Sequence, residues 1–440
     1  YEIGIGIPAE PLFRSVIIYS RSLLRNAMRQ AQDSMSYYRL MGLYGKTFFI
    51  SSDFDSILYY NRPVKEYDKR AAACPRWNDV LSDVYNIEGN VWMQLNQPDS
   101  AVAYYEKSYA YRLKGEKGHL LSDICMNLAD AHLHRGELAH TASYYRKALF
   151  ICDSLHLSEH SKFPVYCGLG QTYMDLRDFD LSNHYYELAG QFFDEMTVSE
   201  KWVYLNNRGN HYYYKKDYQE ALVYMRQAAE LIADYPQMVF ESNLSKVNLG
   251  DLYLLTNRLD SAENNLNEGY RYFSEIKNNS AMHYIETLMI ELSLKKGNIA
   301  RAREMIARTA STGHVDANML TIRNQYLQHY YEKAGDYRNA YEYLKRDYQL
   351  NDSIRSERIR TRVAELDMRY RQDTIVLRKE MQIQRQAGEV RVLKLSMYIW
   401  VLVCLLLAAG TVVIIWYMRK KREFLRERFF QQINRVRMEN

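Results

Sequence analysis

The side chains with the clearest chemistry are asparagines that stand four positions apart at two places in the chain. A side-chain amide both donates and accepts hydrogen bonds, and residues four apart share one face of a helix. Two such amides can therefore hold the backbone of an extended peptide. A tyrosine and an aspartate occupy groove-lining positions of the predicted inner helices, and the expected partner site consists of Asn86, Asn90, Asn206, Asn210, Tyr213 and Asp251. For any one of them, the alternative is a polar residue that only contacts water.

Motifs for catalysis or metal binding are not found. The 11 histidines include no HExxH spacing, and the sequence has no Gly-rich phosphate loop and no nucleophile elbow. Cys152 and Cys167 fall on consecutive predicted helices, where two buried thiols are favoured over a disulfide. We therefore predict no catalytic residue, no metal ligand and no cofactor. The net charge of +5 is small for 440 residues and does not indicate a nucleic-acid partner.

The elements that must position the polar residues are repeated pairs of helices. In 209–228 a small residue is followed by an aromatic residue three positions later, and small and large residues then alternate at helical spacing. This pattern resembles the tetratricopeptide repeat, in which small residues let the two helices of a hairpin approach closely. The small position of the second helix recurs at 57, 101, 141, 182, 221, 262, 302 and 340. These intervals of 38 to 44 residues exceed the usual repeat of about 34, so the helices or turns are expected to be longer.

The predicted fold class is all-α, a superhelical solenoid of tetratricopeptide repeats followed by a long linker helix and one transmembrane helix. Residues 1–40 are expected to form an N-terminal capping hairpin, because a terminal repeat has one apolar face without a neighbour. Residues 41–350 are assigned to about eight degenerate repeats. An ordinary helical bundle is the alternative, but eight copies in one register argue against it.

A membrane-spanning helix is predicted over 397–418, where no residue is charged. Its 22 residues would extend about 33 Å, enough to cross a hydrocarbon layer of about 30 Å. Trp400 lies near one end, and Trp416 and Tyr417 lie at the other, as is typical of residues at membrane interfaces. The alternative, a buried core helix, would need neighbours on all its sides.

The basic residues after the span predict its orientation. Arg419, Lys420, Lys421 and Arg422 follow it directly and would stay in the cytoplasm, as would the rest of a basic helix over 419–440. The repeats would then be periplasmic, in a single-pass protein of a bacterial inner membrane. That placement needs an export signal, and a signal peptide removed before Tyr1 or an incomplete record would explain why none is visible. A tail-anchored protein with cytosolic repeats is the competing topology.

Between the repeats and the span, residues 351–396 are predicted to form a long linker helix. Val363, Leu366, Tyr370, Leu377 and Met381 approximate the seam of a coiled coil. The sequence therefore favours a homodimer through 351–396, and the alternative is a single helix that lies along the last repeats.

This order of elements resembles the repeat-containing membrane sensors of bacterial two-component systems. The specific resemblance is confined to the basic stretch 418–422 and to 429–440, which are similar to the segment that leads into a histidine-kinase phosphoacceptor region. It implies that a periplasmic protein or peptide is sensed and that a kinase-like output follows, although no kinase residue is present in these 440 residues. A regulator with a helix-turn-helix DNA-binding output and a membrane-anchored scaffold without signalling are the alternatives.

Overall fold

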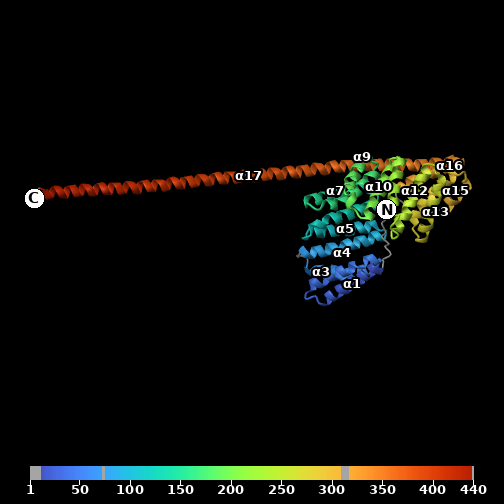
Figure 1. Cartoon of the computed structure of the whole chain (residues 1–440), viewed down its shortest axis with the longest axis horizontal. Coiled ribbons are helices and arrows are strands. Elements are labelled where there is room, and N and C mark those ends of the chain that lie inside the picture. The colour runs from blue at the N-terminus through green and yellow to red at the C-terminus, as the bar shows by residue number, and fades with distance from the viewer. Residues whose placement is uncertain (1–10, 72–74, 309–316, 439–440) are drawn as a thin grey trace. The chain divides into compact units, whose positions relative to one another are not determined.

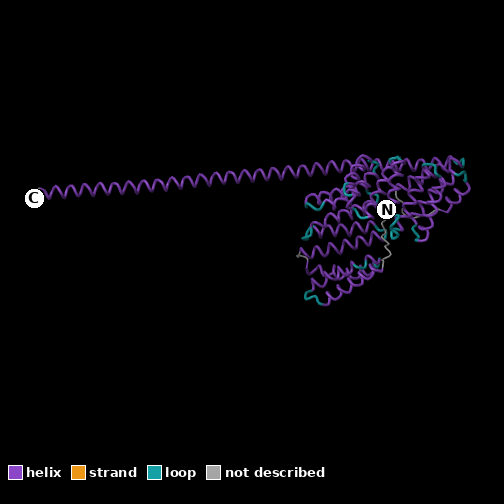
Figure 2. Tube along the Cα trace, in the orientation of Figure 1, coloured by secondary structure: helices purple, strands orange, loops and turns teal. Residues whose placement is uncertain are grey.

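The structure is a computed structural model that describes the backbone of residues 11–71, 75–308 and 317–438. Within the helices it leaves some side chains undescribed, chiefly those of 366–392 and 402–410. Over the described backbone every regular element is a helix, and Figure 2 accordingly shows helices and loops alone. The chain divides into two units, Tyr1–Glu365 and Leu366–Asn440, which are described separately below.

The helices are long in the repeats and are joined by short turns. Their bounds are α1 Pro11–Arg29, α2 Ser34–Lys46, η1 Phe49–Ser51, α3 Phe54–Ala71, α4 Pro75–Gln94, α5 Pro98–Arg112, η2 Gly118–Leu120, α6 Leu121–His134, α7 Leu138–Ser154, η3 Glu159–Lys162, α8 Phe163–Asp175, α9 Phe179–Gly190, η4 Phe193–Glu195, α10 Val198–Tyr214, α11 Tyr218–Leu231, α12 Val239–Leu255, α13 Leu259–Glu275, α14 Asn279–Lys295, α15 Ile299–Arg308, α16 Ala317–Lys333 and α17 Tyr337–Met438.

Consecutive helices of the first unit form hairpins that stack on one another, from α2 with α3 to α14 with α15 (Figure 1). The helices α16 and α17 contact each other through the stacked rings of Tyr331 and Tyr343. The second helix of each pair carries one of the eight positions that the sequence pattern marked as the close-contact position. All eight are buried, and seven of them have no exposed surface: Ile57, Ala101, Thr141, Ser182, Ala221, Ala262 and Ala302, with Ala340 5% exposed. The repeat register read from the sequence is therefore the packing register of the fold.

Glycines in the first helix of several hairpins explain how closely the two helices approach. A Cβ atom at Gly89 would lie 2.4 Å from the Tyr105 ring, and one at Gly170 would lie 2.8 Å from the Tyr186 ring. The same contact joins Gly209 to Met225, at 2.8 Å. In each case the large residue comes 16 positions later, on the second helix. Small and large residues thus interlock across every one of these hairpins.

The turn inside each hairpin has a fixed geometry with one residue of positive φ. Lys216 (φ 67°) and Gly297 (φ 78°) are two of these residues. The next residue along the chain donates its backbone N–H to a carbonyl five positions earlier, as Asp217 does to Tyr212 at 2.9 Å. This is the Schellman arrangement, which satisfies the carbonyls that a helix leaves open at its C-terminus.

Two predicted boundaries fall inside helices. The boundary after residue 40 lies within α2, because α2 forms the first hairpin with α3 and α1 packs against α2 at the end of the stack. The boundary after residue 350 lies within α17, because the second helix of the last repeat continues without a break into the predicted linker and span.

No helix in the described part of the chain is both long enough and apolar enough to cross a bilayer. The middle of the predicted span, 402–410, lies outside the described side chains. The predicted seam of a homodimer over 351–396 also falls largely outside them, since 366–392 are not described.

Candidate functional site

Two of the four predicted asparagines, Asn86 and Asn206, are joined to asparagines of the next repeat. Asn127 on α6 donates to Asn86 on α4, with a distance of 2.9 Å between Nδ2 and Oδ1. Asn248 on α12 donates to Asn206 on α10 at 2.8 Å. Asn206 and Asn248 are both buried, which leaves their remaining donors and acceptors to satisfy inside the protein. These amides therefore link the first helices of neighbouring hairpins.

Asn90 has a partner within its own hairpin. The Tyr105 hydroxyl donates to its Oδ1 at 2.7 Å, and the ring of the same tyrosine lies against Gly89. The structure thus brings together two groups of predicted residues, one on α4 and one on α10 and α12. The contact of these two groups with a partner remains a prediction.

The second group surrounds a small recess between α10, α12 and α14. Three of the six predicted residues line it, and the full lining is Asn210, Tyr213, Tyr214, Met225, Asn248, Asp251, Leu252 and Tyr284. The polar groups come from three consecutive first helices of the stack. The amides, phenols and carboxyl thus place several hydrogen-bonding groups at one point of the stack.

The Asp251 carboxyl dominates the electrostatics of the recess. Asp251 is 1% exposed, and the Tyr284 hydroxyl donates to its Oδ2 at 2.6 Å. Burial raises the pKa of Asp251 to about 6, although hydrogen bonds from Tyr284 and Tyr213 act in the opposite direction. The pKa of Tyr213 is raised above its ordinary value by burial and by the Asp251 charge. The recess therefore holds a carboxyl that can gain a proton under mildly acidic conditions.

Sequence reasoning missed a second polar site, where the start of α17 contacts helices from the middle of the stack. Glu365 forms an ion pair with Arg146 on α7, with 3.2 Å between carboxylate oxygen and guanidinium nitrogen. The Tyr173 hydroxyl on α8 donates to the same carboxylate. The side chains of Arg146 and Glu365 are 10% and 7% exposed, and Tyr173 is 1% exposed. A buried charge pair of this kind is stable only when its other hydrogen bonds are also made.

Further contacts extend this interface along α17. Glu357 accepts from the backbone N–H of Ala139 at the start of α7, at 3.2 Å. Arg358 donates to the carbonyl of Arg177, and Arg362 forms an ion pair of 2.7 Å with Asp178 in the turn between α8 and α9. The buried positions of α17 here are spaced by seven and four residues: Ile354, Thr361 and Glu365. The predicted coiled-coil seam consists of other residues: its first position, Val363, is 62% exposed here and does not belong to this buried set.

The cysteines of the solenoid that the structure describes are buried free thiols: Cys125, Cys152 and Cys167. Cys152 and Cys167 are therefore not bridged. Burial raises the pKa of Cys125 to about 12, so its thiol stays protonated near neutral pH. These thiols act as small apolar side chains in the core.

The predicted membrane residues lie on the second unit with their side chains exposed. Trp400 is 67% exposed, Trp416 60% and Tyr417 62%. Arg419, Lys420, Lys421 and Arg422 follow on the same helix and are also exposed.

The fold and its stacked hairpins define an all-helical protein of the tetratricopeptide-repeat type, a solenoid of helix pairs. Residues 163–189, which form α8 and α9, match the tetratricopeptide repeat family. No curated protein sequence matches the chain.

Solved structures share the solenoid fold at low sequence identity. The apo form of the quorum sensor NprR from B. thuringiensis is 13% identical, with a TM-score of 0.57 over 77% of this chain and 94% of NprR. A Rap protein complexed with competence and sporulation factor is 11% identical, with a TM-score of 0.54 over 78% of this chain and 99% of that chain. The Rap conjugation gene regulator of plasmid pLS20, in complex with the Phr* peptide, is 13% identical with a TM-score of 0.51, over 78% of this chain and 94% of that chain.

Proposed function

We propose that this protein is a membrane-attached sensor that binds a peptide or protein through the first helices of its repeats. The observation that carries the binding part is the convergence of Asn210, Tyr213 and Asp251 on one recess that spans three repeats. Two of the solenoids with the same fold are in complex with the competence and sporulation factor and with the Phr* peptide, respectively. The partner class is an extended peptide segment, because amides and phenols repeated along a stack can follow a peptide backbone.

Peptide selection on the full chain tests this site. The chain, held in detergent, is panned against a displayed library of random peptides, and an enriched peptide is synthesised for anisotropy measurements. Asn210→Ala and Tyr284→Phe are expected to weaken its binding at least tenfold, since each removes a polar group that faces the recess. Asn127→Ala is the control, because Asn127 lies on α6, outside the recess, and its hydrogen bond is to Asn86. Equal affinity of all four proteins would exclude the recess as the peptide site.

Membrane attachment is supported by the apolar side chains on both sides of 402–410. Met397, Ile399 and Val401 precede that stretch and are more than 50% exposed. Val412 to Trp416 follow it and are also more than 50% exposed. The side chains of a long helix that is apolar on all sides must be shielded from water all around the helix, and the acyl chains of a bilayer provide that shielding. The sequence of 397–418 supports a single span with 419–440 in the cytoplasm.

A fusion experiment tests the topology. A reporter that fluoresces only in the cytoplasm, joined after Asn440, should be active, and alkaline extraction should leave the protein in the membrane fraction. Deletion of 397–418 should release it. A reporter active only in the periplasm would reverse the proposed orientation, and alkaline release of the unaltered chain would exclude the span.

Signalling to a cytoplasmic output, kinase-like or DNA-binding, forms the last part of the proposal. Its support is that α17 is one helix from Tyr337 to Met438 and is held to α7 and α8 by the Glu365 contacts. A partner that changes the packing of the repeats would therefore act on the same helix that enters the predicted span. A scaffold without output would lack this response, and disulfide crosslinking of cysteines introduced in 419–440 would then be unchanged by the selected peptide.

A further inference from the structure

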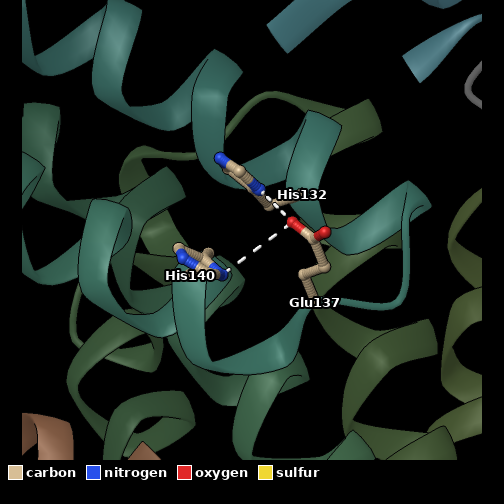
Figure 3. A group of neighbouring side chains, drawn as sticks. All are labelled: His132, Glu137 and His140. Carbon is tan, nitrogen blue, oxygen red and sulfur yellow. Dashed lines mark hydrogen bonds and ion pairs between the residues drawn. The ribbon is translucent and has the colours of Figure 1, made fainter. Parts of the chain in front are cut away.

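Two histidines and a glutamate meet at the turn between α6 and α7 (Figure 3). His132 is near the end of α6, Glu137 is in the turn, and His140 is in the first turn of α7. Glu137 Oε2 lies 2.7 Å from His132 Nδ1 and 3.8 Å from His140 Nδ1. The two rings are stacked, with centroids 5.0 Å apart and planes inclined by 19°. We infer that these three side chains form a binding site for a divalent transition-metal ion such as Zn²⁺.

The distances are close to those that a shared ion requires. One donor atom from each of the three residues lies within 4.8 Å of the other two. Two ligands of a tetrahedral zinc, each about 2.0–2.1 Å from the metal, lie about 3.3–3.4 Å apart. The two contacts of Glu137 Oε2 therefore differ from that spacing by about half an ångström, which small side-chain rotations supply. The ligand set of two imidazoles and one carboxylate suits zinc, copper or nickel and leaves a coordination position open.

The surroundings hold the ligands in place. Arg135 forms an ion pair with the other carboxylate oxygen, Glu137 Oε1, at 2.9 Å, so Oε2 is left to face the imidazoles. Asp99 lies 3.0 Å from Arg135 and offsets part of its charge. On the far side His132 stacks on Tyr144, with centroids 5.3 Å apart. Outer contacts of this kind orient metal ligands and raise affinity.

The nitrogen of His132 that faces Glu137 Oε2, Nδ1, is the atom that would bind the ion. A metal ion at Nδ1 binds the neutral tautomer whose single proton is on Nε2, so the proton that Nδ1 shares with Glu137 moves to Nε2 by exchange with solvent when the ion binds. The His140 side chain is 65% exposed and the Glu137 side chain 32% exposed, so an ion can enter from solvent.

Zinc titration of the full chain tests the site. After removal of bound metal with a chelator, calorimetry with ZnCl₂ at pH 7.5 should detect one saturable site. His140→Ala and Glu137→Gln should each weaken it at least tenfold. His184→Ala, which removes an exposed histidine on α9, should leave the affinity unchanged. No zinc binding by the unaltered chain, or equal binding by His140→Ala and Glu137→Gln, would overturn the inference.

A stability measurement keeps the test independent of folding defects. A ligand that binds only the folded state raises the melting temperature as its concentration increases. Zinc should therefore raise the melting temperature of the unaltered chain and of His184→Ala, but not that of His140→Ala. If zinc stabilises His140→Ala equally, the ion is bound elsewhere and the site is excluded.

Discussion

Two pairs of asparagines in this solenoid, one pair buried and one half-buried, are joined by hydrogen bonds between neighbouring repeats. The pairs Asn86–Asn127 and Asn206–Asn248 span 41 and 42 residues, close to one repeat length. A buried polar group without a hydrogen bond destabilises a fold by about 1–3 kcal/mol, so each pair also disfavours a shifted stacking of the hairpins. The residues that the sequence marked for a partner thus have a structural role as well.

The pH dependence of stability should report the buried Asp251 carboxyl. Its pKa is raised to about 6 in the folded chain, above its ordinary value. As the pH rises from 4 to 7 the unfolded chain ionises this group first, so its contribution to stability falls. Asp251→Asn cannot ionise and should gain about 2–3 kcal/mol relative to the unaltered chain over that range. Urea unfolding of both proteins at several pH values measures this difference.

Two outcomes of that experiment are distinct. A free-energy difference between the two proteins that is constant from pH 4 to pH 7 would show that the pKa of Asp251 is not raised. A difference that grows with pH confirms the direction of the shift, whatever the other titrating groups do, because they are common to both proteins.

The close contact at Gly89 should make even a methyl group destabilising. Its Cβ would lie 2.4 Å from the Tyr105 ring, and Tyr105 is buried with its hydroxyl bound to Asn90, so the ring has little room to move. Gly89→Ala should lose about 1–3 kcal/mol of unfolding free energy. Gly118→Ala is the control, since no atom lies within 4 Å of the added Cβ. Equal stability of the two variants would contradict the interlocking of small and large residues.

How much of the site could be predicted from the sequence differs between residues. Repeat register placed Asn210, Tyr213 and Asp251 on first helices, and they line one recess. The partners Asn127 and Asn248 were not predicted, because a hydrogen bond between repeats depends on the rotation from one hairpin to the next. The cluster of His132, Glu137 and His140 was not predicted, because its spacing matches no common metal motif, although its first and last residues lie only eight positions apart across one turn.

At the scale of elements, the turns repeat as regularly as the helices. Each hairpin turn has one residue of positive φ: Ser52, Asn96, Gly136, Arg177, Lys216, Asn257, Gly297 and Gly335. These turn residues recur at the same intervals as the buried small positions of the second helices. The repeat, which is longer than the usual tetratricopeptide repeat, is therefore a property of helices and turns together. The helix pairs could be predicted because small and large residues alternate at fixed offsets. The turn residues could not, since only three of the eight are glycine.

The turn geometry makes Lys216 a site where glycine should stabilise the fold. Lys216 has φ 67° and an exposed side chain, and a residue with a Cβ is strained in that conformation. Lys216→Gly should raise the free energy of unfolding by about 0.5–1 kcal/mol. Gly297→Ala, at the same position of a later turn, should lower it by about 1 kcal/mol. Opposite signs in thermal or urea unfolding are expected, and equal signs would contradict this account of the turns.

At the scale of the whole chain, the first unit is held together by contacts between residues far apart in sequence. Asn318 on α16 donates to Asp175 at 2.9 Å and accepts from Arg177 at 2.8 Å, and α17 adds the contacts of Glu357, Arg362 and Glu365. A solenoid otherwise has contacts only between neighbouring repeats. The twist accumulated over several repeats decides which elements meet, so the sequence pattern of one repeat could not predict them.

The Glu365 contact should decide how firmly the start of α17 is held. Glu365→Ala leaves the buried Arg146 without its carboxylate partner, and the loss of one member of a buried ion pair costs about 3 kcal/mol. The loss should lower the free energy that is needed to open residues 353–365 locally. Their backbone amides should therefore exchange with solvent about 100-fold faster. Arg355→Ala, on an exposed face of the same helix, is the matched control and should leave exchange unchanged. If hydrogen exchange over 353–365 were alike in both variants, α17 would be free of the repeats, and a partner bound there could not act on it through this interface.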